Sequence, residues 1–155
     1  MVTSDAPLNG RAIELITFRI GAQEFCIDVT SIREIRSWTT VTPIPHAPAF
    51  VLGVVNLRGI VLPIIDLSAR LGFAPAEPTP RHAIMVAELH HQIVGLLVDG
   101  VSDIITVKSS DFQSPPDVAS DIAKSFISGI TSLEARLISK LNLDAVVPPT
   151  EARAA

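Results

Sequence analysis

Residues 53–67 read GVVNLRGIVLPIIDL. Two apolar runs flank the segment Asn56-Leu57-Arg58-Gly59, whose Asn and Gly are typical of the turn that closes a β-hairpin. The second run, Ile60–Ile65, is too apolar for a strand with one wet face, so we expect it to be buried on both faces or to lie in a small barrel core. Arg58 is then held at the tip of a rigid hairpin, where it can meet a partner but has no obvious catalytic company. This arrangement favours a docking protein over an enzyme.

The composition predicts one compact domain with a large core. The chain has 155 residues, of which 48% are hydrophobic and 18% are charged, and a chain of this length buries about two-thirds of its unfolded surface. Abundant valine and isoleucine, with no tyrosine, favour strands. The net charge of −4 argues against a basic face that grips nucleic acid. The apolar runs are far shorter than the ~20 residues of a membrane helix, so we expect no direct membrane insertion.

The only cysteine, Cys26, excludes an intrachain disulfide and fits a reducing cytosol. Since it lies between Phe25 and Ile27, we expect a small buried side chain and not a reactive thiol. Residues 1–10 show no signal peptide. Together with residues 147–155 they are predicted to be flexible tails around a domain at 11–146.

The domain contains an internal duplication. Leu15–Ile20 and Glu24–Val29 predict a hairpin, and its pattern returns after a proline-rich linker at 74–80. A shift of 69 residues aligns Leu15 with Ile84, Thr17 with Val86, Gln23 with Gln92, Phe25 with Val94, Ile27 with Leu96, Val29 with Val98, Ile32 with Val101 and Ile35 with Ile104. A slightly larger shift aligns Gly53-Val54 with Gly129-Ile130, and Leu62, Ile65 and Leu67 with Ile138, Leu141 and Leu143. The halves, about 13–72 and 82–146, would each have a marginal core alone, so we expect them to pack about a pseudo-two-fold axis. The sequence leaves open whether they exchange strands.

Short helices are expected at two places. Thr30 or Ser31 is placed to cap a short helix that carries Ile32 and Ile35 on one face. Asp66 or Ser68 is placed to cap a single-turn helix that stops at Gly72. The prolines between residues 43 and 48 predict an extended connection.

No residue pattern predicts a catalytic, cofactor or metal site. The four histidines, His46, His82, His90 and His91, lack metal-ligand spacing. His90-His91 matches the first hairpin turn, and His46 is expected in a surface loop. There is no glycine-rich phosphate loop, and Asp99 and Asp103 flank a turn. The alternative from another class is a small β-barrel enzyme that uses Asp66 or a histidine.

Residues 56–59 and 63–67, Asn-Leu-Arg-Gly and Pro-Ile-Ile-Asp-Leu, resemble the hallmark segment of the CheW family of bacterial chemotaxis coupling proteins. The similarity extends over residues 25–29, 32–35, 43–50, 95–103 and 126–130, and spans roughly residues 13–146. It implies an all-β fold with short helices, in which two SH3-like five-stranded β-barrels are related by the duplication.

The same resemblance implies a non-enzymatic cytoplasmic adaptor in receptor arrays at the inner face of the membrane. Its partners would be the helical cytoplasmic tip of transmembrane chemoreceptors, the regulatory domain of the histidine kinase CheA and other copies of the family in rings. A coupling scaffold for a non-motility chemosensory pathway is the alternative.

The resemblance also implies which residues meet these partners. In CheW-like proteins a groove between the barrels takes the receptor tip, and the matching apolar residues are Ile16, Val29, Ile32, Val98 and Val101. Taken singly, such residues are more often core. Glu34 would lie at the groove's rim, where it pairs with a partner or is simply solvated.

Asn56, Arg58 and Gly59 match the motif that the family uses for receptor and kinase coupling. On spacing alone, Arg58 is equally an exposed turn residue, a structural fork to neighbouring carbonyls or a clamp for a partner's carboxylate.

Two features near the C-terminus depart from the family pattern. Lys140 stands where an apolar strand residue is usual, and it would extend outward or protect a sheet edge. The segment Leu133–Arg136 lacks the Gly or Asp expected in a hairpin turn.

Overall fold

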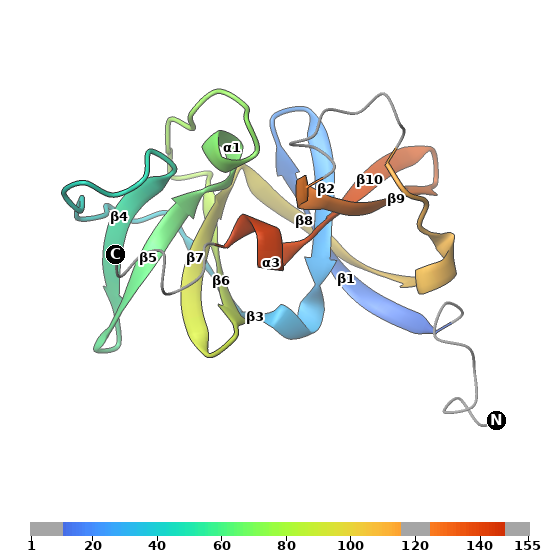
Figure 1. Cartoon of the computed structure of the whole chain (residues 1–155), viewed down its shortest axis with the longest axis horizontal. Helices are drawn as coiled ribbons and strands as arrows, with labels where there is room; N and C mark the ends of the chain where they lie inside the picture. Colours follow the sequence, from blue (N-terminus) through green and yellow to red (C-terminus); the bar gives the residue numbers. More distant parts are fainter. Residues whose placement is uncertain (1–10, 116–124, 148–155) are drawn as a thin grey trace.

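The computed structural model describes residues 11–115 and 125–147. The predicted N-terminal tail, 1–10, and residues 148–155 of the predicted C-terminal tail, 147–155, lie outside the described residues. The described chain forms two five-stranded sheets that pack side by side, as Figure 1 shows. Each sheet curls into a small barrel, and we name these barrel A and barrel B. The predicted all-β fold with short helices is confirmed.

The strands of barrel A lie in the order β8 (Gly100–Lys108), β1 (Ala12–Ile20), β2 (Gln23–Asp28), β10 (Arg136–Leu141) and β9 (Ile127–Leu133). Those of barrel B lie in the order β3 (Ile32–Ser37), β6 (Ala83–Leu89), β7 (Gln92–Val98), β5 (Ile60–Asp66) and β4 (Val51–Leu57). The short helices are α1 (Leu67–Arg70) and α3 (Leu143–Val146), and the 3-10 turns are η3 (Val29–Ser31) and η4 (Ser109–Asp111).

The two repeats exchange strands. Barrel A combines the first hairpin of the N-terminal repeat with β8, β9 and β10 of the C-terminal repeat, and barrel B is built in the converse way. The parallel pairings are equivalent, because Lys140 faces Cys26 in barrel A and Ile64 faces Gly95 in barrel B. The chain therefore crosses between the barrels twice, at η3 and at the β7–β8 junction.

Each barrel closes through one backbone bridge. Thr42 pairs with Val54 in barrel B, and Gln113 pairs with Ile130 in barrel A. At the barrel B seam, a Cβ on Gly53 would lie 2.3 Å from the carbonyl oxygen of Thr42. Only glycine allows the two backbones to approach this closely.

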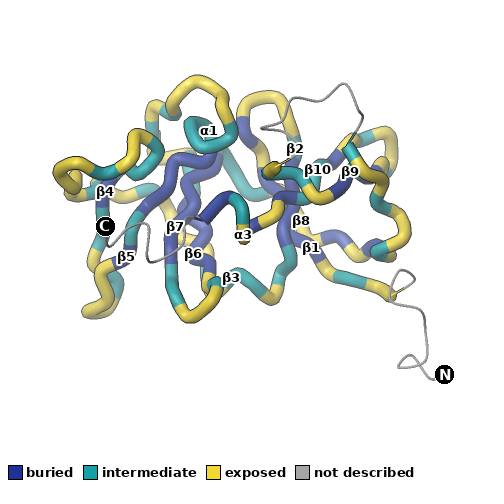
Figure 2. Tube along the Cα trace, viewed as in Figure 1, coloured by how far each residue is buried: buried dark blue, intermediate teal, exposed yellow. Residues whose placement is uncertain are grey.

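The central strands are largely buried, as Figure 2 shows. They are apolar on both faces, because one face fills a barrel and the other faces the twin barrel. Barrel A encloses Leu15, Cys26, Ile105, Val107 and Ile138, and barrel B encloses Leu62, Ile64, Ile84, Val86 and Leu97. Between them lies a shared cluster that includes Phe18, Phe25 and Ile27 from barrel A and Met85, Leu96 and Val98 from barrel B. Each such side chain contributes about 1.5–3 kcal/mol when buried, so separating the barrels would be costly.

Arg70 ties the two repeats together on the side of α1. Its guanidinium donates from Nε to the carbonyl of Val146 at 2.9 Å and from Nη2 to the carbonyl of Ala145 at 3.0 Å. It also lies over the rings of Phe50 and Phe126, at 4.3 and 5.0 Å from their centroids. Together with the shared cluster, this contact supports a body that moves as one unit.

Several sequence predictions need correction. The segment after Ser31 is strand β3 and not a helix, and Asp28 caps the η3 turn through its side chain. Ile32–Ser37 pairs with β6 at the edge of barrel B, and this tertiary pairing outweighs the local preference for a helix. Val147 is buried in the shared cluster, so the predicted C-terminal tail begins one residue too early.

The hairpin predictions are confirmed. The turns lie at Gly21-Ala22, Arg58-Gly59 and His90-His91. The last hairpin forms although its turn residues are Glu134 and Ala135, both with positive φ. The α1 helix is capped by Asp66, as expected.

Candidate functional site

The tip of the β4–β5 hairpin is held in one conformation by local chemistry. Leu57 pairs with Ile60, which leaves Arg58 and Gly59 as a two-residue turn with φ values of 51° and 88°. Positive φ at both positions is the geometry that suits the twist of a hairpin. The side chain of Asn56 accepts a 2.8 Å hydrogen bond from the backbone N–H of Gly59. Asn56 and Gly59 therefore build the turn, and Arg58 projects from it.

Arg58 reaches across the seam of barrel B. Its guanidinium pairs with one carboxylate oxygen of Glu34 on β3, and the other oxygen accepts from Arg36 at 3.3 Å. The hydrogen bond from Arg58, followed by that from Arg36, holds the pKa of Glu34 below its usual value. The Arg58 side chain nevertheless remains 68% exposed. An exposed pair of this kind stabilises a fold little, so its cation is available to a partner.

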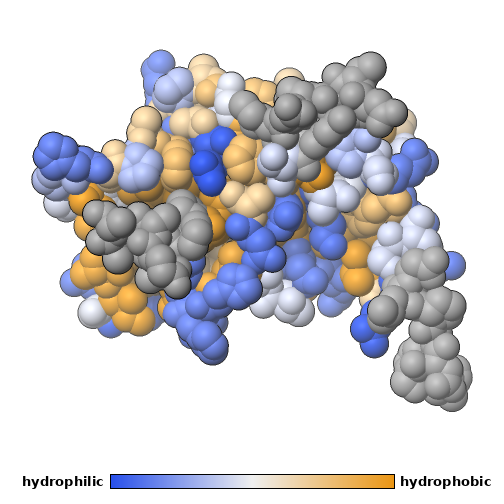
Figure 3. Space-filling model, viewed as in Figure 1, coloured by the Kyte–Doolittle hydropathy of each residue, from blue (hydrophilic) through white to orange (hydrophobic). Residues whose placement is uncertain are grey.

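Two exposed aliphatic side chains follow this turn at the start of β5. Ile60 and Val61 are 52% and 65% exposed, and Figure 3 shows hydrophobic surface over this hairpin tip. Ile60 also lines a 50 Å³ cavity, together with Arg33, Glu34, Leu57, Arg58, Leu62, Val86 and Ile93. A charged rim around apolar side chains is the composition of a protein-docking surface.

The exposure of Ile60 and Val61 corrects a sequence prediction. Within the run Ile60–Ile65 only Leu62, Ile64 and Ile65 are buried, and they fill the cores. Because hydrophobic runs were interpreted as core, the exposure of these two residues was missed. The signal that could have found them is their place next to the turn, beyond the reach of the barrel interior.

The equivalent tip of barrel A is arranged differently. The β9–β10 turn places Glu134 at the position of Arg58 and Ala135 at that of Gly59, with φ values of 50° and 68°. Arg136 next to it is only 31% exposed. Its guanidinium forks onto Glu24, with hydrogen bonds of 2.8 and 2.5 Å, and lies 3.4 Å from Asp103. Arg136 is thus occupied within the fold.

The remaining candidate residues gather at the two crossings between the barrels. Val29 lies in η3, Ile32 begins β3, and Val101 lies near the start of β8. Ile32 and Val101 are half-buried and pack against the shared cluster. Ile16 and Val98 belong to that cluster and are buried. The structure therefore places four of the five apolar candidates in or against the shared cluster, and it leaves Val29, Ile32 and Val101 partly accessible at two separate crossings.

The groups that could support chemistry are occupied or isolated. Asp66 is 1% exposed, and its carboxylate accepts from the backbone N–H groups of Ser68, Ala69 and Ala76. Cys26 is buried as predicted, and burial raises the pKa of its thiol to about 12. Within residues 11–115 and 125–147, no three His, Cys, Asp or Glu side chains are placed to hold a metal ion. No helix in the same ranges is long and apolar enough to span a bilayer.

Comparison with known proteins decides the family. A family model described as a CheW-like domain matches residues 14–150. The chain belongs to the CheW family. Chemotaxis protein CheW of Rhizobium meliloti (strain 1021) is 58% identical over 155 residues, which cover 100% of both chains. Chemotaxis protein CheW of Bacillus subtilis (strain 168) is 32% identical over 142 residues, 92% of this chain and 91% of the relative.

A solved structure shares the two-barrel CheW architecture. The scaffolding protein TtCheW from Thermoanaerobacter tengcongensis superposes with a TM-score of 0.81 at 26% identity. The match covers 90% of this chain and 95% of the other. The resemblance noted from the hallmark segment is confirmed across the domain.

Proposed function

We propose that this protein is a non-enzymatic adaptor that couples transmembrane chemoreceptors to the histidine kinase CheA, in the cytoplasm beneath receptor arrays. CheW family membership, and relatives named as chemotaxis proteins, support this pathway over a non-motility one. The single observation that supports docking over chemistry is the β4–β5 tip. It presents an exposed cation and exposed aliphatic side chains, while the buried Asp66 carboxylate is saturated by backbone donors.

The tip of barrel B is the proposed kinase-binding surface. Arg58 can exchange or share its carboxylate partner Glu34 with a carboxylate of the kinase's regulatory domain, because the pair is exposed and weak. Ile60 and Val61 would lose their exposed surface in the same contact. An arginine beside apolar anchors is typical of the residues that dominate binding energy.

The receptor tip is proposed to dock at the crossings between the barrels. Val29, Ile32 and Val101 are partly accessible there, and Ile16 and Val98 support them from the shared cluster. An amphipathic helix that lays an apolar face on such residues is a common mode of recognition.

The opposite end of the molecule is proposed to meet another ring member, including further copies of this chain. Ile104 and Leu137 on barrel A are exposed, and they occupy positions equivalent to Ile35 and Val61 on barrel B. Two unlike ends on one rigid body generate head-to-tail contacts, which close into rings when the rotation permits.

In this proposal the adaptor transmits signals by position. A receptor shift changes kinase activity only if the contacts differ between the receptor's signalling states. A body whose barrels share one core passes a displacement from the receptor surface to the kinase surface without deforming.

The test is CheA autophosphorylation in receptor-containing membranes, with and without this protein. We expect activity to rise on its addition and to become sensitive to attractant. Unchanged kinase activity, together with no binding to either component, would refute the proposal. Turnover of a small molecule by the purified chain alone would favour the enzyme alternative.

A further inference from the structure

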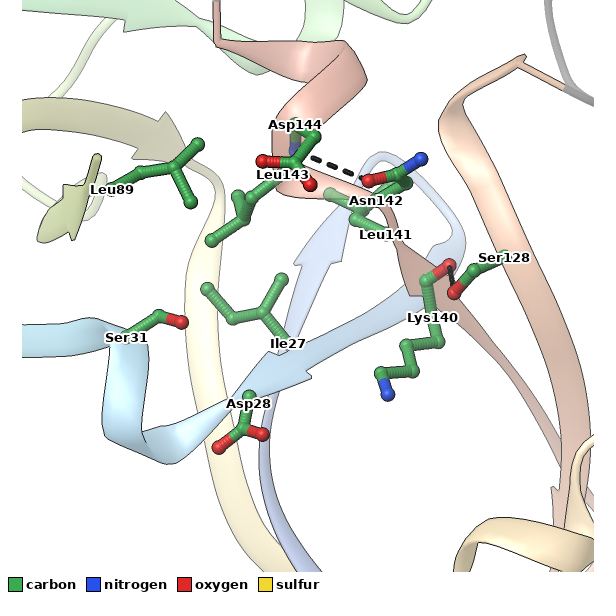
Figure 4. A pocket seen from close by; sticks show the side chains of 10 residues that line it. All are labelled: Ile27, Asp28, Ser31, Leu89, Ser128, Lys140, Leu141, Asn142, Leu143 and Asp144. Carbon is green, nitrogen blue, oxygen red and sulfur yellow. Dashed lines mark hydrogen bonds between the residues drawn. The ribbon is translucent and has the colours of Figure 1, made fainter. Parts of the chain in front are cut away.

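A second cavity opens at the mouth of barrel A, remote from the β4–β5 tip (Figure 4). It has a volume of 210 Å³. Figure 4 shows side chains from β2 and η3 on one side and from β10 and α3 on the other. Its apolar wall is Ile27, Leu89, Leu141 and Leu143, which belong to the shared cluster or pack against it. Its polar wall is Asp28, Ser31, Ser128, Lys140, Asn142 and Asp144.

Three of the six polar-wall residues have aliphatic equivalents in the twin barrel. The strand registers equate Lys140 with Ile64, because each occupies the same step of the parallel pairing. The hairpin registers equate Asp28 with Leu97 in the same way. Ile64 and Leu97 are fully buried in the core of barrel B.

A third replacement lies at a β-bulge. Ser128 is skipped in the β9–β10 pairing as Leu52 is skipped in the β4–β5 pairing. Leu52 packs against the barrel B core, whereas Ser128 lines the cavity. Barrel A therefore has polar residues, Asp28, Ser128 and Lys140, at three positions where barrel B has aliphatic ones. Departures from core packing that gather at one point are expected at functional sites.

The opposite charges on the polar wall do not neutralise each other. Within the described ranges, neither Lys140 nor Asp28 belongs to an ion pair with N···O of 4.0 Å or less. Lys140 instead lies over the ring of Phe112, with its ammonium 5.7 Å from the centroid. Asp28 is oriented by hydrogen bonds from the backbone N–H and the hydroxyl of Thr30. A cation and an anion that are not paired with each other on the wall of one cavity suit a guest that carries both complementary charges.

We propose that the mouth of barrel A binds a small zwitterion with an aliphatic side chain, that is, a free α-amino acid of about leucine size. Its carboxylate would face Lys140, its ammonium would face Asp28, and its side chain would cover Ile27 and Leu143. The 210 Å³ volume is below that of sites for drug-sized ligands, about 300–1,000 Å³, which limits the guest to this size.

The experiment is an amide NMR titration of the full-length protein with L-leucine and two matched half-ligands. These are 4-methylpentanoate, which lacks the ammonium, and 3-methylbutylamine, which lacks the carboxylate. We expect saturable shifts at residues 27–31 and 140–144 with a Kd on the order of millimolar, as befits so few atoms. Each half-ligand should bind about tenfold more weakly or worse, since it loses one charge-assisted hydrogen bond.

The twin barrel supplies the control variants. Lys140→Ile and Ser128→Leu install the residues of barrel B, so the fold has a precedent for them, and both should abolish the leucine shifts. Lys140→Met keeps the length of the side chain and removes only its charge, and thermal melting checks that each variant is folded. No saturable shift at concentrations far above millimolar, equal binding of a half-ligand, or unchanged binding by folded Lys140→Met would each overturn the proposal.

Discussion

The two barrel tips have the same backbone conformation, but their arginines differ in position and exposure. Arg58-Gly59 in barrel B and Glu134-Ala135 in barrel A form equivalent turns with positive φ at both positions. In barrel B the arginine sits on the turn itself and is 68% exposed. In barrel A the arginine comes after the turn, as Arg136, and is 31% exposed.

This difference shows how a duplicated fold separates stability from binding. Arg136 joins Glu24 on β2 to Asp103 on β8, so it holds three strands of barrel A together. Arg58 makes one exposed pair with Glu34, which leaves a cation beside Ile60 and Val61. One tip is therefore a structural tie, and the other is the surface that we propose for a partner.

The largest expected effect concerns the seams that close the barrels. In Gly53→Ala the new Cβ would lie 2.3 Å from the Thr42 carbonyl oxygen, so backbone must move, and we expect a loss of about 3 kcal/mol or more. In Gly129→Ala the nearest atom is the Cβ of Phe112 at 3.0 Å, and we expect about 1 kcal/mol. Urea denaturation measures both, and equal losses would contradict the difference between the seams.

Arg58→Ala should weaken binding to the CheA regulatory domain by about 2 kcal/mol, roughly 30-fold in Kd, with an unchanged melting temperature. The matched variant Glu134→Ala removes the side chain at the equivalent turn position and should change this Kd less than about threefold. Calorimetric titration gives both values. Equal effects of the two variants would show that the tips are not specialised.

Glycine in the barrel A turn should stabilise the protein. Ala135 adopts a φ of 68°, a region that costs an L-residue roughly 1–2 kcal/mol. We expect Ala135→Gly to gain about 0.5–1 kcal/mol after the greater freedom of glycine in the unfolded chain is subtracted. The converse Gly59→Ala should lose a similar amount. A destabilised Ala135→Gly in thermal melts would mean that the turn is not strained.

The smallest expected effect is on how steeply the stability of the protein falls with decreasing pH, compared between the parent protein and Glu24→Gln. The hydrogen bond from Arg136 lowers the pKa of Glu24 below 4.5, and the one from Thr17, followed by that from Arg136, lowers the pKa of Asp103 below 3.8. The stability from a lowered pKa is complete above the unfolded value and is lost as the pH falls through the folded value. Glu24→Gln should therefore flatten the loss of stability below about pH 4.5. If Glu24→Gln had the same pH profile of denaturation midpoints as the parent protein, the Arg136–Glu24 ion pair would not stabilise the fold.

Much of the fold was predictable from the sequence because the repeats reinforce each other. Hairpin turns such as His90-His91 were found by alignment with Gly21-Ala22, although histidine is a weak turn signal alone. The strand exchange was not predictable. It depends on whether β3, which follows η3, pairs in the sheet of β1 and β2 or in the other sheet, and the local sequence pattern is the same in either case. The segment Ile32–Ser37 was mistaken for a helix because an edge strand carries a weak alternation.

The candidate site was predictable only in part. Asn56, Arg58 and Gly59 follow from turn chemistry and from the family motif, but their partner Glu34 is brought to them only by closure of the barrel. The exposure of Ile60 and Val61 was not predicted, because the sequence alone does not distinguish an exposed isoleucine or valine from a buried one. The charged residues of the barrel A mouth became notable only when the strand registers matched Lys140 with Ile64.

The most direct test of the account is a charge exchange, Arg58→Glu combined with Glu34→Arg, assayed for CheA activation in receptor-containing membranes. The exchange preserves the ion pair across the barrel B seam and reverses the charge that the tip presents. If Arg58 serves a partner, the double variant will melt like the parent protein and will fail to activate the kinase, as will Arg58→Glu alone. Activation restored to the parental level by the exchange would show that the pair itself matters, and would contradict the assignment of this tip as the docking surface.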